Sequence, residues 1–200
     1  FHPRFLVNGP LTGYAIVDNS SDEAAEGLAW NIVLYDQQLC SSPTEVAFIG
    51  SFDDALSFGK KVSERLSDLS LRFPLSLSER EIFLVQSVRR TIRREDCEIL
   101  VPKDNSASWT IIVSKKQAIL DKAMEYFPEF QTYLRKRFIE IIAVDSIADA
   151  VDLVKNIPLR PSFRGIDGVQ TIGYSLSSEN LKALLNSLDK MHVYRIVPLK

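Results

Sequence analysis

Cysteine and histidine are scarce in this sequence. Two cysteines and two histidines occur among 200 residues, and no cluster of Cys and His has the spacing of metal ligands. Two cysteines also provide no disulfide framework, which favours a reducing compartment. We therefore expect a cytoplasmic protein with no bound metal ion.

Excess positive charge and long apolar runs are missing as well. The formal net charge is −2 at pH 7, so no overall positive field attracts nucleic acid or an anionic membrane. No apolar run approaches the roughly 20 residues that a membrane-spanning helix needs. The sequence thus predicts neither a nucleic-acid partner nor a membrane span.

Nucleotide-binding fingerprints are also lacking. The eight glycines form neither G-x-G-x-x-G nor G-x-x-x-x-G-K-[ST]. Both motifs place backbone N–H groups against phosphates, usually at the start of a helix. A self-contained nucleotide-binding enzyme is therefore disfavoured.

What the sequence contains is a regular alternation of strand-like and helix-like segments. Strands are predicted at 14–18, 45–49, 97–102, 109–114, 139–145, 170–176 and 193–199. Helices are predicted from after Ser20 to near Tyr35, and at 52–72, 78–92, 146–156 and 178–190. Strands separated by helices of this length indicate an α/β fold with a largely parallel sheet flanked by helices.

Two of these helices begin with the S-x-x-E spacing of a capping box. The pairs are Ser20 with Glu23 and Ser78 with Glu81. The last helix carries a leucine stripe, which we interpret as its inward face: Leu181, Leu184, Leu185 and Leu188.

Four arginines lie near the end of the predicted 78–92 helix: Arg89, Arg90, Arg93 and Arg94. Such a group could meet coenzyme A or a 2′-phosphate. Acidic residues lie close by, which favours a solvated, charged helix face instead.

Cys40 lies where a predicted helix gives way to a predicted strand, in "NIVLYDQQLCSSPTEVAFIG" (31–50). Backbone N–H groups at such a junction can stabilise a thiolate or an oxyanion. The alternative for any single cysteine is a small buried hydrophobic residue, and we expect that role for Cys97 at the start of an apolar strand. Trp30 and Tyr35 flank the same region and would either line an acyl channel or pack in the core.

Residues 8–50 resemble the nucleophile region of the aldehyde dehydrogenase superfamily. They contain a small-residue turn, a short strand, an Asp-containing helix start, an Ala-rich helix and a Gln-x-Cys turn. Within that superfamily, "DQQLCSSP" (36–43) and "QTIGYSLSSENLKALLNSLDKMHVYRIVPL" (170–199) are similar to LuxC-type fatty acyl-CoA reductases of bacterial luminescence and their relatives. The resemblance implies that residues 1–200 form the catalytic domain and that the cofactor-binding domain lies outside this chain.

The resemblance also implies a reaction. Cys40 matches the nucleophile that attacks a long-chain fatty acyl thioester, and a hydride from NADPH then releases the aldehyde. The residues that match the supporting nucleophile loop are Asp36, Gln37, Gln38, Leu39 and Ser41. One oxyanion donor, the backbone N–H of Cys40, would be present here, and the second would come from the other domain. This chain alone should therefore not catalyse the reduction of acyl-CoA.

The implied partners are a fatty acyl-CoA or an acyl-carrier protein as substrate, with a homo-oligomer or a complex with an acyl-transferring enzyme as the assembly. Two departures from the superfamily pattern bear on the chemistry. "LVNGPLTG" (6–13) has no carboxylate where oxidising members carry a base for the hydrolytic water, which suits a reductase. "TYLRKRF" (132–138) lacks the glutamate that grips the nicotinamide ribose, so no cofactor-binding residue is identified in this chain.

Two other functions stay open from the sequence. One is a non-catalytic α/β interaction or oligomerisation domain. The other is a phosphate-activated acyl reductase of the glutamyl-phosphate type, which the charge and hydrophobicity around the cysteine would distinguish from a fatty acyl reductase.

Overall fold

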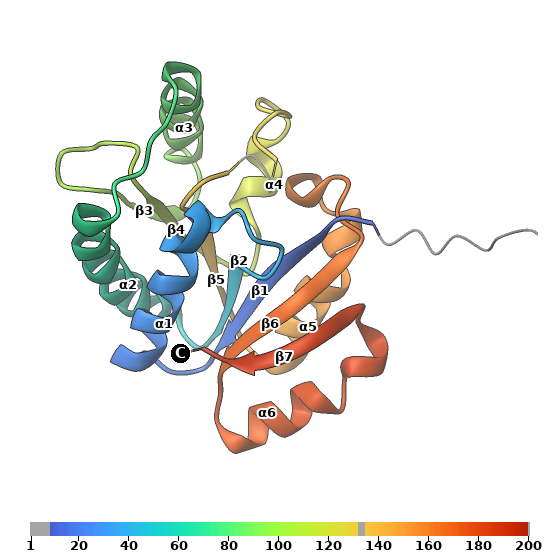
Figure 1. The fold of residues 1–200 in the computed structure, drawn as a ribbon. Helices are drawn as coiled ribbons and strands as arrows, with labels where there is room; N and C mark the ends of the chain where they lie inside the picture. The colour runs from blue at the N-terminus through green and yellow to red at the C-terminus, as the bar shows by residue number, and fades with distance from the viewer. Residues whose placement is uncertain (1–8, 132–134, 200) are drawn as a thin grey trace, which may run out of the picture.

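A computed structural model describes residues 9–131 and 135–199 as a seven-stranded sheet with helices on both faces (Figure 1). The strand order is β3-β4-β5-β2-β1-β6-β7. The strands are β1 (Leu11–Val17), β2 (Pro43–Ile49), β3 (Cys97–Leu100), β4 (Thr110–Lys115), β5 (Phe138–Val144), β6 (Gly168–Ser175) and β7 (Val193–Pro198). Only the β3–β4 pair is antiparallel among these strands, so the predicted α/β fold with a largely parallel sheet is confirmed.

The helices are α1 (Asp22–Val33), α2 (Phe52–Arg72), α3 (Glu79–Ile92), α4 (Ile119–Ala123), α5 (Ile147–Lys155) and α6 (Ser178–Leu185). Five helices, α1, α2, α3, α5 and α6, lie where the sequence predicts them, and the short helix α4 was not predicted. Short 3₁₀ helices are η1 (Leu34–Gln37), η3 (Ile157–Leu159), η4 (Pro161–Phe163) and η5 (Leu188–Lys190). In the described part of the chain, no helix combines the length and the apolar character that crossing a membrane requires.

The sheet separates two apolar cores. Ala15 and Val46 face α1 and α2, whereas the next residues along the same strands, Ile16 and Ala47, face α5 and α6. Because both faces are covered, the central strands are apolar almost throughout, and every residue of β5 is buried. Continuous apolar runs such as "FIEIIAV" therefore read correctly as strands of a parallel sheet.

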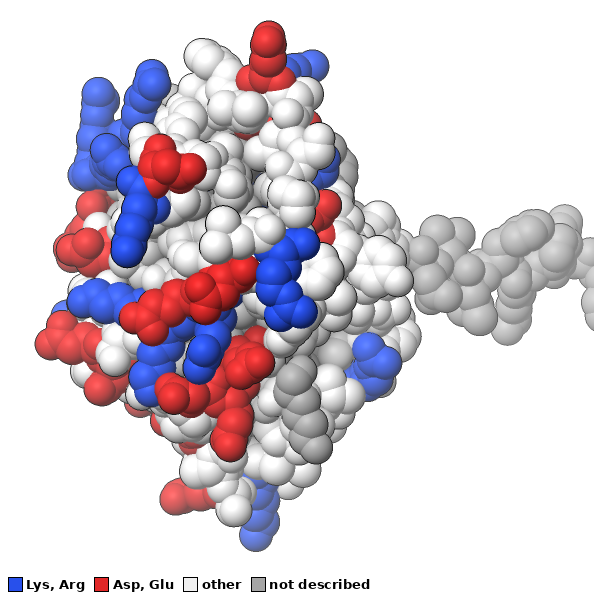
Figure 2. All heavy atoms as spheres, turned by 60° about the vertical axis from the view of Figure 1, so that its left-hand side comes forward, with Lys and Arg blue, Asp and Glu red and all other residues white. Residues whose placement is uncertain are grey.

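The outer surface of the helices carries mixed charge. On the face shown in Figure 2, Lys and Arg side chains are interspersed with Asp and Glu side chains. An ion pair of 2.8 Å between Lys61 of α2 and Asp22 of α1 is one contact of this kind. Both side chains are largely exposed to solvent, which screens their charges, so the pair contributes little to stability.

The two predicted capping boxes differ in outcome. The Ser78–Glu81 box is confirmed, with Ser78 N donating to Glu81 Oε2 (2.8 Å) and Glu81 N donating to Ser78 Oγ (3.3 Å). The Ser20–Glu23 box is wrong, because α1 is capped one residue later by Ser21, whose Oγ accepts from Ala24 N (3.2 Å). The side chain of Asn19 accepts the N–H of Ser21, and this turn shifts the cap forward.

The leucine stripe is only partly inward. Leu184 is buried, but Leu185 is about half exposed. Leu188, in the 3₁₀ turn η5 that follows the end of α6 at Leu185, is partly buried against the same core as Leu184.

Arg89 corrects the prediction of a solvated arginine face. Its side chain is 1% exposed, whereas Arg90, Arg93 and Arg94 are exposed as predicted. The guanidinium donates to Thr110 Oγ1 (2.9 Å) and to the carbonyls of Ser106 (2.8 Å) and Trp109 (2.7 Å), and burial lowers the pKa of Arg89 to about 10. Arg89 thus fixes the loop that leads into β4, away from the predicted nucleophile.

Candidate active site

Cys40 lies in the turn between α1 and β2, residues 34–42, which we call the nucleophile turn. The helix before it ends at Val33, two residues earlier than predicted. Three successive residues, Tyr35, Asp36 and Gln37, have left-handed backbones with φ of 52°, 53° and 67°. Left-handed backbones in residues other than glycine cost on the order of 1–3 kcal/mol each, and they concentrate at functional sites where the surroundings enforce them.

The enforcing contacts come from residues 135–138, which lead into β5. The nucleophile turn leads into β2, and β2 pairs with β5 in parallel, so both segments lie at the amino edge of the same sheet. The buried Gln37 side chain accepts from Phe138 N and donates to the carbonyl of Pro43, both at 2.8 Å. The Gln38 amide donates to the carbonyl of Arg135 at 2.7 Å.

An ion pair adds a third connection between the two segments. Asp36 Oδ1 lies 2.6 Å from Nη2 of Arg137, whose side chain is 2% exposed. Three of the five predicted loop residues, Asp36, Gln37 and Gln38, are therefore fixed by contacts across about 100 residues of sequence. The other two, Leu39 and Ser41, lie on either side of Cys40, with Leu39 exposed and Ser41 half-buried.

The thiol of Cys40 is exposed, and the protein has no disulfide at either cysteine. A bond of 2.9 Å from Ser42 N to the carbonyl of Leu39 closes the turn around it. Among residues 9–131 and 135–199, neither Cys40 N nor Ser41 N donates to a protein acceptor. Two free backbone donors beside an exposed thiol can stabilise a negative oxygen that forms next to the sulfur.

A glycine of β1, Gly13, allows the backbone of the nucleophile turn to pack closely against the strand. A Cβ atom at Gly13 would lie 2.3 Å from the carbonyl oxygen of Ser42 and 2.5 Å from that of Ser41. The pairing of β1 with β2 shifts register between Gly13 and Ala15, where the turn joins the sheet. Only glycine allows the backbone after Cys40 to approach β1 this closely.

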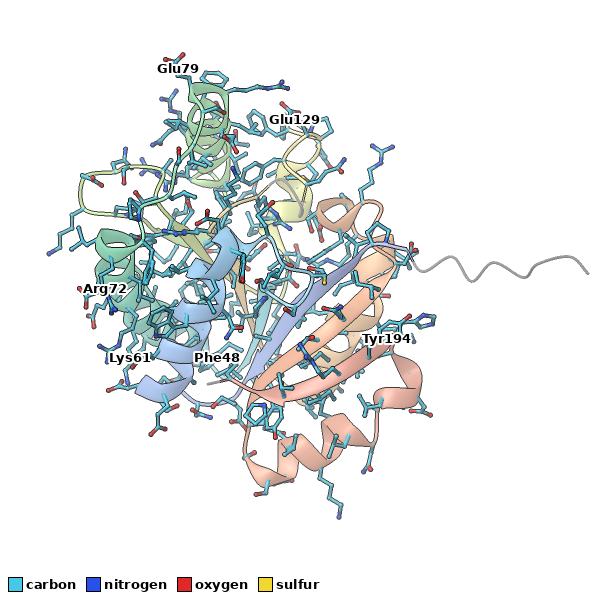
Figure 3. All side chains as sticks on the ribbon, viewed as in Figure 1. Phe48, Lys61, Arg72, Glu79, Glu129 and Tyr194 are labelled. Atoms are coloured by element: carbon cyan, nitrogen blue, oxygen red, sulfur yellow. The ribbon has the colours of Figure 1, made fainter. Side chains whose placement is uncertain are left out.

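Three apolar side chains on the nucleophile turn are exposed. Leu34 is 48% exposed, Tyr35 72% and Leu39 41%. Core packing, the default expectation, is therefore wrong for Tyr35. Trp30 is half-buried against Phe73, with ring centroids 5.7 Å apart. Arg72, labelled at the end of α2 in Figure 3, has its Cζ atom 5.9 Å from the centroid of the Trp30 ring.

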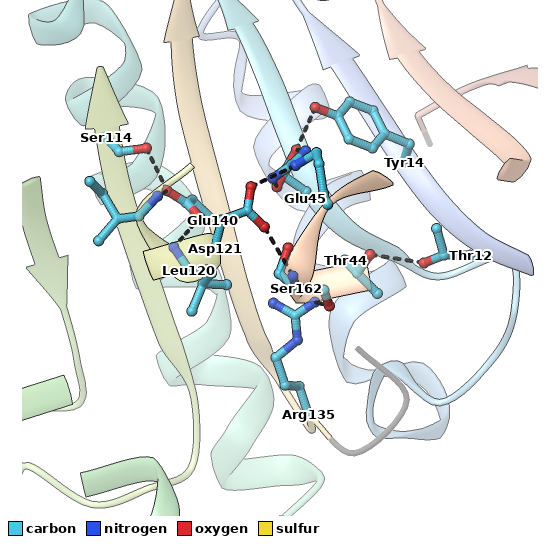
Figure 4. A network of polar contacts seen from close by, with 12 residues as sticks. Thr12, Tyr14, Thr44, Glu45, Ser114, Leu120, Asp121, Arg135, Glu140 and Ser162 are labelled. Atoms are coloured by element: carbon cyan, nitrogen blue, oxygen red, sulfur yellow. Dashed lines mark hydrogen bonds and ion pairs between the residues drawn. The ribbon is translucent and has the colours of Figure 1, made fainter. Parts of the chain in front are cut away.

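A buried charged network lies under the same edge of the sheet, and sequence reasoning missed it (Figure 4). The carboxylate of Glu45 in β2 accepts hydrogen bonds from Nη1 and Nη2 of Arg160, at 2.6 and 2.5 Å, and from the hydroxyl of Tyr14 at 2.8 Å. Arg160 Nε also donates to Asp121 (2.9 Å), which ties the α5–β6 connection to α4. The sequence did contain a signal for this network, because β2 and β5 are apolar strands that each carry one glutamate, at the third position.

The second of these glutamates, Glu140, is the register partner of Glu45. It accepts from Ser114 Oγ (2.6 Å) and from the first two N–H groups of α4, at Ile119 (2.6 Å) and Leu120 (3.1 Å). Burial, followed by the charge of Glu45, raises the pKa of Glu140 to about 7. The network connects β2, β5, α4 and the α5–β6 connection, and in the described structure none of these hydrogen bonds involves Cys40.

Cys97 has the surroundings of a core residue. It is half-buried beside the cluster formed by α3 and α4, and its thiol donates to the carbonyl of Ile92 at 3.4 Å. Burial raises the pKa of Cys97 to about 11. Roughly one thiol in a thousand is then ionised at pH 8, so Cys97 is a poor nucleophile.

We expect Cys97→Ser to leave acyl transfer to the protein unchanged within about twofold, because the Cys97 thiol is held protonated. The stability cost should be about 1 kcal/mol or less, since the side chain is half-buried and can keep its hydrogen bond. Labelling with a radioactive acyl-CoA, next to a denaturation curve, measures both effects. Loss of labelling in a folded Cys97→Ser protein would show that the wrong cysteine had been chosen.

Two of the sequence patterns extend beyond the described residues. In "LVNGPLTG" (6–13) only the last five residues are described, and in "TYLRKRF" (132–138) only the last four. In the described part of the chain, no three His, Cys, Asp or Glu side chains come together as metal ligands.

The fold defines a class. A comparison with solved structures finds NAD-dependent aldehyde dehydrogenases from Burkholderia multivorans (16% identity, TM-score 0.63) and Sinorhizobium meliloti (17%, 0.59), and a Thermus 1-pyrroline-5-carboxylate dehydrogenase with bound NAD (15%, 0.56). The matches cover 96%, 95% and 95% of this chain but 36%, 37% and 36% of those chains. The chain therefore has the fold of one part of an aldehyde dehydrogenase and spans little more than a third of its length.

The family is shown by the sequence itself. The model of the family described as acyl-CoA reductase (LuxC) matches residues 3–199, which is nearly the whole chain. The chain belongs to the acyl-CoA reductase (LuxC) family. A comparison with curated proteins found no match.

Proposed function

We propose that this chain is the nucleophile-bearing domain of a reductase that converts a long-chain fatty acyl thioester to the aldehyde. The observation that carries the proposal is the placement of Cys40: an exposed thiol on a strained turn, next to free backbone N–H groups, in a chain of the acyl-CoA reductase family. The acyl donor is acyl-CoA or an acyl-carrier protein.

The chain's own residues account for the acyl-transfer half of the reaction. The Cys40 thiolate attacks the carbonyl carbon of the donor thioester, and the carbonyl oxygen becomes negative. The N–H groups of Cys40 and Ser41, which donate to no acceptor in the described structure, would stabilise this oxygen. When the carbonyl re-forms, the C–S bond to the carrier breaks and the carrier leaves as a thiolate. The product is a thioester between the acyl group and Cys40.

The exposed apolar side chains of the nucleophile turn support a fatty substrate. Leu34, Tyr35 and Leu39 are exposed on the nucleophile turn itself, where an acyl chain attached to Cys40 would cover them. The charged side chain of the turn, Asp36, is paired with Arg137. Both features favour a hydrocarbon chain over the charged substrate of a glutamyl-phosphate type reductase.

The described residues do not fit a complete dinucleotide site. A single glycine, Gly50, lies between a strand and the following helix where a glycine-rich phosphate loop would be needed. We propose that a nicotinamide cofactor, NADPH, is bound mainly by a domain outside this chain, and that it supplies the hydride that releases the aldehyde.

The proposed division of labour predicts the behaviour of the chain alone. Incubated with a long-chain acyl-CoA and NADPH, it should acquire an acyl group on Cys40 but should not consume NADPH steadily. The acyl transfer should be slow, because loss of one oxyanion donor lowers such rates by roughly 100- to 1,000-fold. NADPH absorbance and protein mass, followed together, measure both processes.

The intact protein is the matched control, and it should reduce the same acyl-CoA to aldehyde. Steady NADPH consumption by the 200-residue chain would show that it holds a full cofactor site, and the division into two domains would have to be abandoned.

A further inference from the structure

Residues 135–138, at the amino edge of the sheet, contact α3, β4 and the segment that contains Phe130. Lys136 forms an ion pair of 2.8 Å with Glu81 of α3, and the rings of Phe138 and Phe130 meet with centroids 4.8 Å apart. The carbonyl of Arg137 accepts from Thr110 N of β4 at 2.8 Å. The segment is therefore anchored independently of the nucleophile turn that it contacts.

Arg137 contacts the nucleophile turn through its side chain. Its buried guanidinium donates from Nη1 to the carbonyl of Phe73 (2.7 Å), next to the end of α2, and from Nη2 to Asp36 (2.6 Å). One planar group thereby bridges the end of α2 and the middle of the nucleophile turn. The third nitrogen, Nε, is buried and finds no partner among the described residues, so the side chain has been desolvated for these two contacts.

Both ends of the ion pair have left-handed backbones. Asp36 has φ of 53° and Arg137 has φ of 48°, and Asp36 is the middle one of the three successive left-handed residues before Cys40. A turn of this kind persists only where its surroundings hold it. Because the turn contains no glycine, side-chain contacts must select its conformation, and the ion pair acts on its central residue.

We propose that Arg137 is a positioning residue for Cys40: through Asp36 it holds the left-handed turn that places the thiol and the two free N–H groups relative to an incoming acyl carbonyl. The inference rests on the proposed acyl transfer to Cys40. It assigns Arg137 no contact with the substrate. Its effect is on the geometry of attack, and a misplacement of about 1 Å at a reacting centre lowers a rate by as much as about 100-fold.

Arg89 offers a matched control within the same chain. It is also a buried arginine, and it donates to the carbonyls of residues 105, 106 and 109 and to Thr110 Oγ1, none of which belongs to the nucleophile turn. Its link to residues 135–138 is indirect, because Thr110 N donates to the backbone carbonyl of Arg137 and not to its guanidinium. Arg137→Lys and Arg89→Lys both keep the charge and lose the planar fork. The two substitutions should therefore destabilise the protein by comparable amounts and differ in their effect on Cys40.

The experiment compares two reactions of Cys40 in the intact protein. One is acylation by palmitoyl-CoA, which needs the thiol and the N–H groups in place. The other is alkylation by iodoacetamide, which needs only an accessible thiol. Both are followed by mass spectrometry of the peptide that contains Cys40. We expect Arg137→Lys to slow acylation by about tenfold to 100-fold while alkylation changes less than about threefold, and Arg89→Lys to leave both rates within about twofold.

Asp36→Asn tests the same connection from the other side. Asp36 is partly exposed, and asparagine tolerates a left-handed backbone, so this variant should fold even where Arg137→Lys does not. We expect it to slow acylation selectively as well.

The outcomes separate the inference from the function on which it rests. Equal acylation rates in the parent and in both Asp36→Asn and Arg137→Lys would overturn the positioning role alone. Equal slowing by Arg89→Lys would also overturn it, because the effect would then reflect general destabilisation. An unmodified protein that accepts no palmitoyl group at all would remove the proposed function, and this inference with it.

Discussion

Replacing Cys40 by serine should abolish acylation of the intact protein by a long-chain acyl-CoA, with a fall of at least about 1,000-fold. A thiolate forms readily near neutral pH and attacks a thioester without help, whereas a serine hydroxyl needs an adjacent base. No histidine is described near the nucleophile turn: among the described residues the histidine is His192, which precedes β7. The same substitution removes the reductive reaction, because no acyl-enzyme forms.

The fold should be nearly unaffected by this change. Cys40 is exposed and makes no side-chain hydrogen bond in the described structure, so the free energy of unfolding should change by less than about 0.5 kcal/mol. The rate of acyl transfer and the denaturation midpoint are measured on the same preparation, with Cys97→Ser as the matched thiol control. An acyl adduct that forms on Cys40→Ser at the parental rate would contradict the assignment of the nucleophile.

Gly13→Ala should have the second-largest effect, although residue 13 has no functional group. The added Cβ would meet the Ser42 carbonyl oxygen at 2.3 Å, and because this atom belongs to the backbone the whole nucleophile turn must move away from β1. We expect acyl transfer to fall by about 100-fold, and the free energy of unfolding to fall by about 1–3 kcal/mol, as for other overpacked sites.

Gly59→Ala is the control for this substitution. Gly59 lies in α2, and its added Cβ would meet side-chain atoms of Val113 (3.1 Å) and Leu100 (3.3 Å). These side chains can give way, and alanine favours the helix by about 1 kcal/mol over glycine. Gly59→Ala should therefore keep its acylation rate. If the Gly13→Ala protein is folded and is acylated at the parental rate, the close packing of the nucleophile turn on β1 does not position the thiol.

The strands and the long helices could be predicted because their signals are local. Helix α2 spans Phe52–Arg72 as the apolar period and Pro74 indicated, and every predicted strand overlaps an observed one. In a sheet covered on both faces, an apolar run is itself the signature of a strand. The error at Ser20 was one residue: Glu23 follows Ser20 at the spacing of a capping box, but the adjacent Ser21 caps the helix.

The contacts that build the site could not be predicted, because they depend on register and on distant pairs. Arg89 and Arg90 are neighbours in sequence, yet one is buried under a loop and the other is exposed. Glu45 and Glu140 come together because β2 and β5 pair in one particular register, which no local pattern specifies. The left-handed backbone at Tyr35, Asp36 and Gln37 could not be predicted, because these positions contain no glycine.

Cys40 itself was found from the residues around it and from their resemblance to a family, not from periodicity. The structure adds the physical reasons why this position suits a nucleophile: exposure, free N–H groups and a turn fixed from outside. Its role in catalysis stays a prediction that chemistry must test.

The most direct test is to mix the intact protein with palmitoyl-CoA in the absence of NADPH, and to weigh the protein before and after treatment with neutral hydroxylamine. We expect a mass increase of one palmitoyl group, located on the peptide that contains Cys40, and its removal by hydroxylamine as befits a thioester. A folded protein that gains no acyl group, or gains it on another residue, would contradict the account.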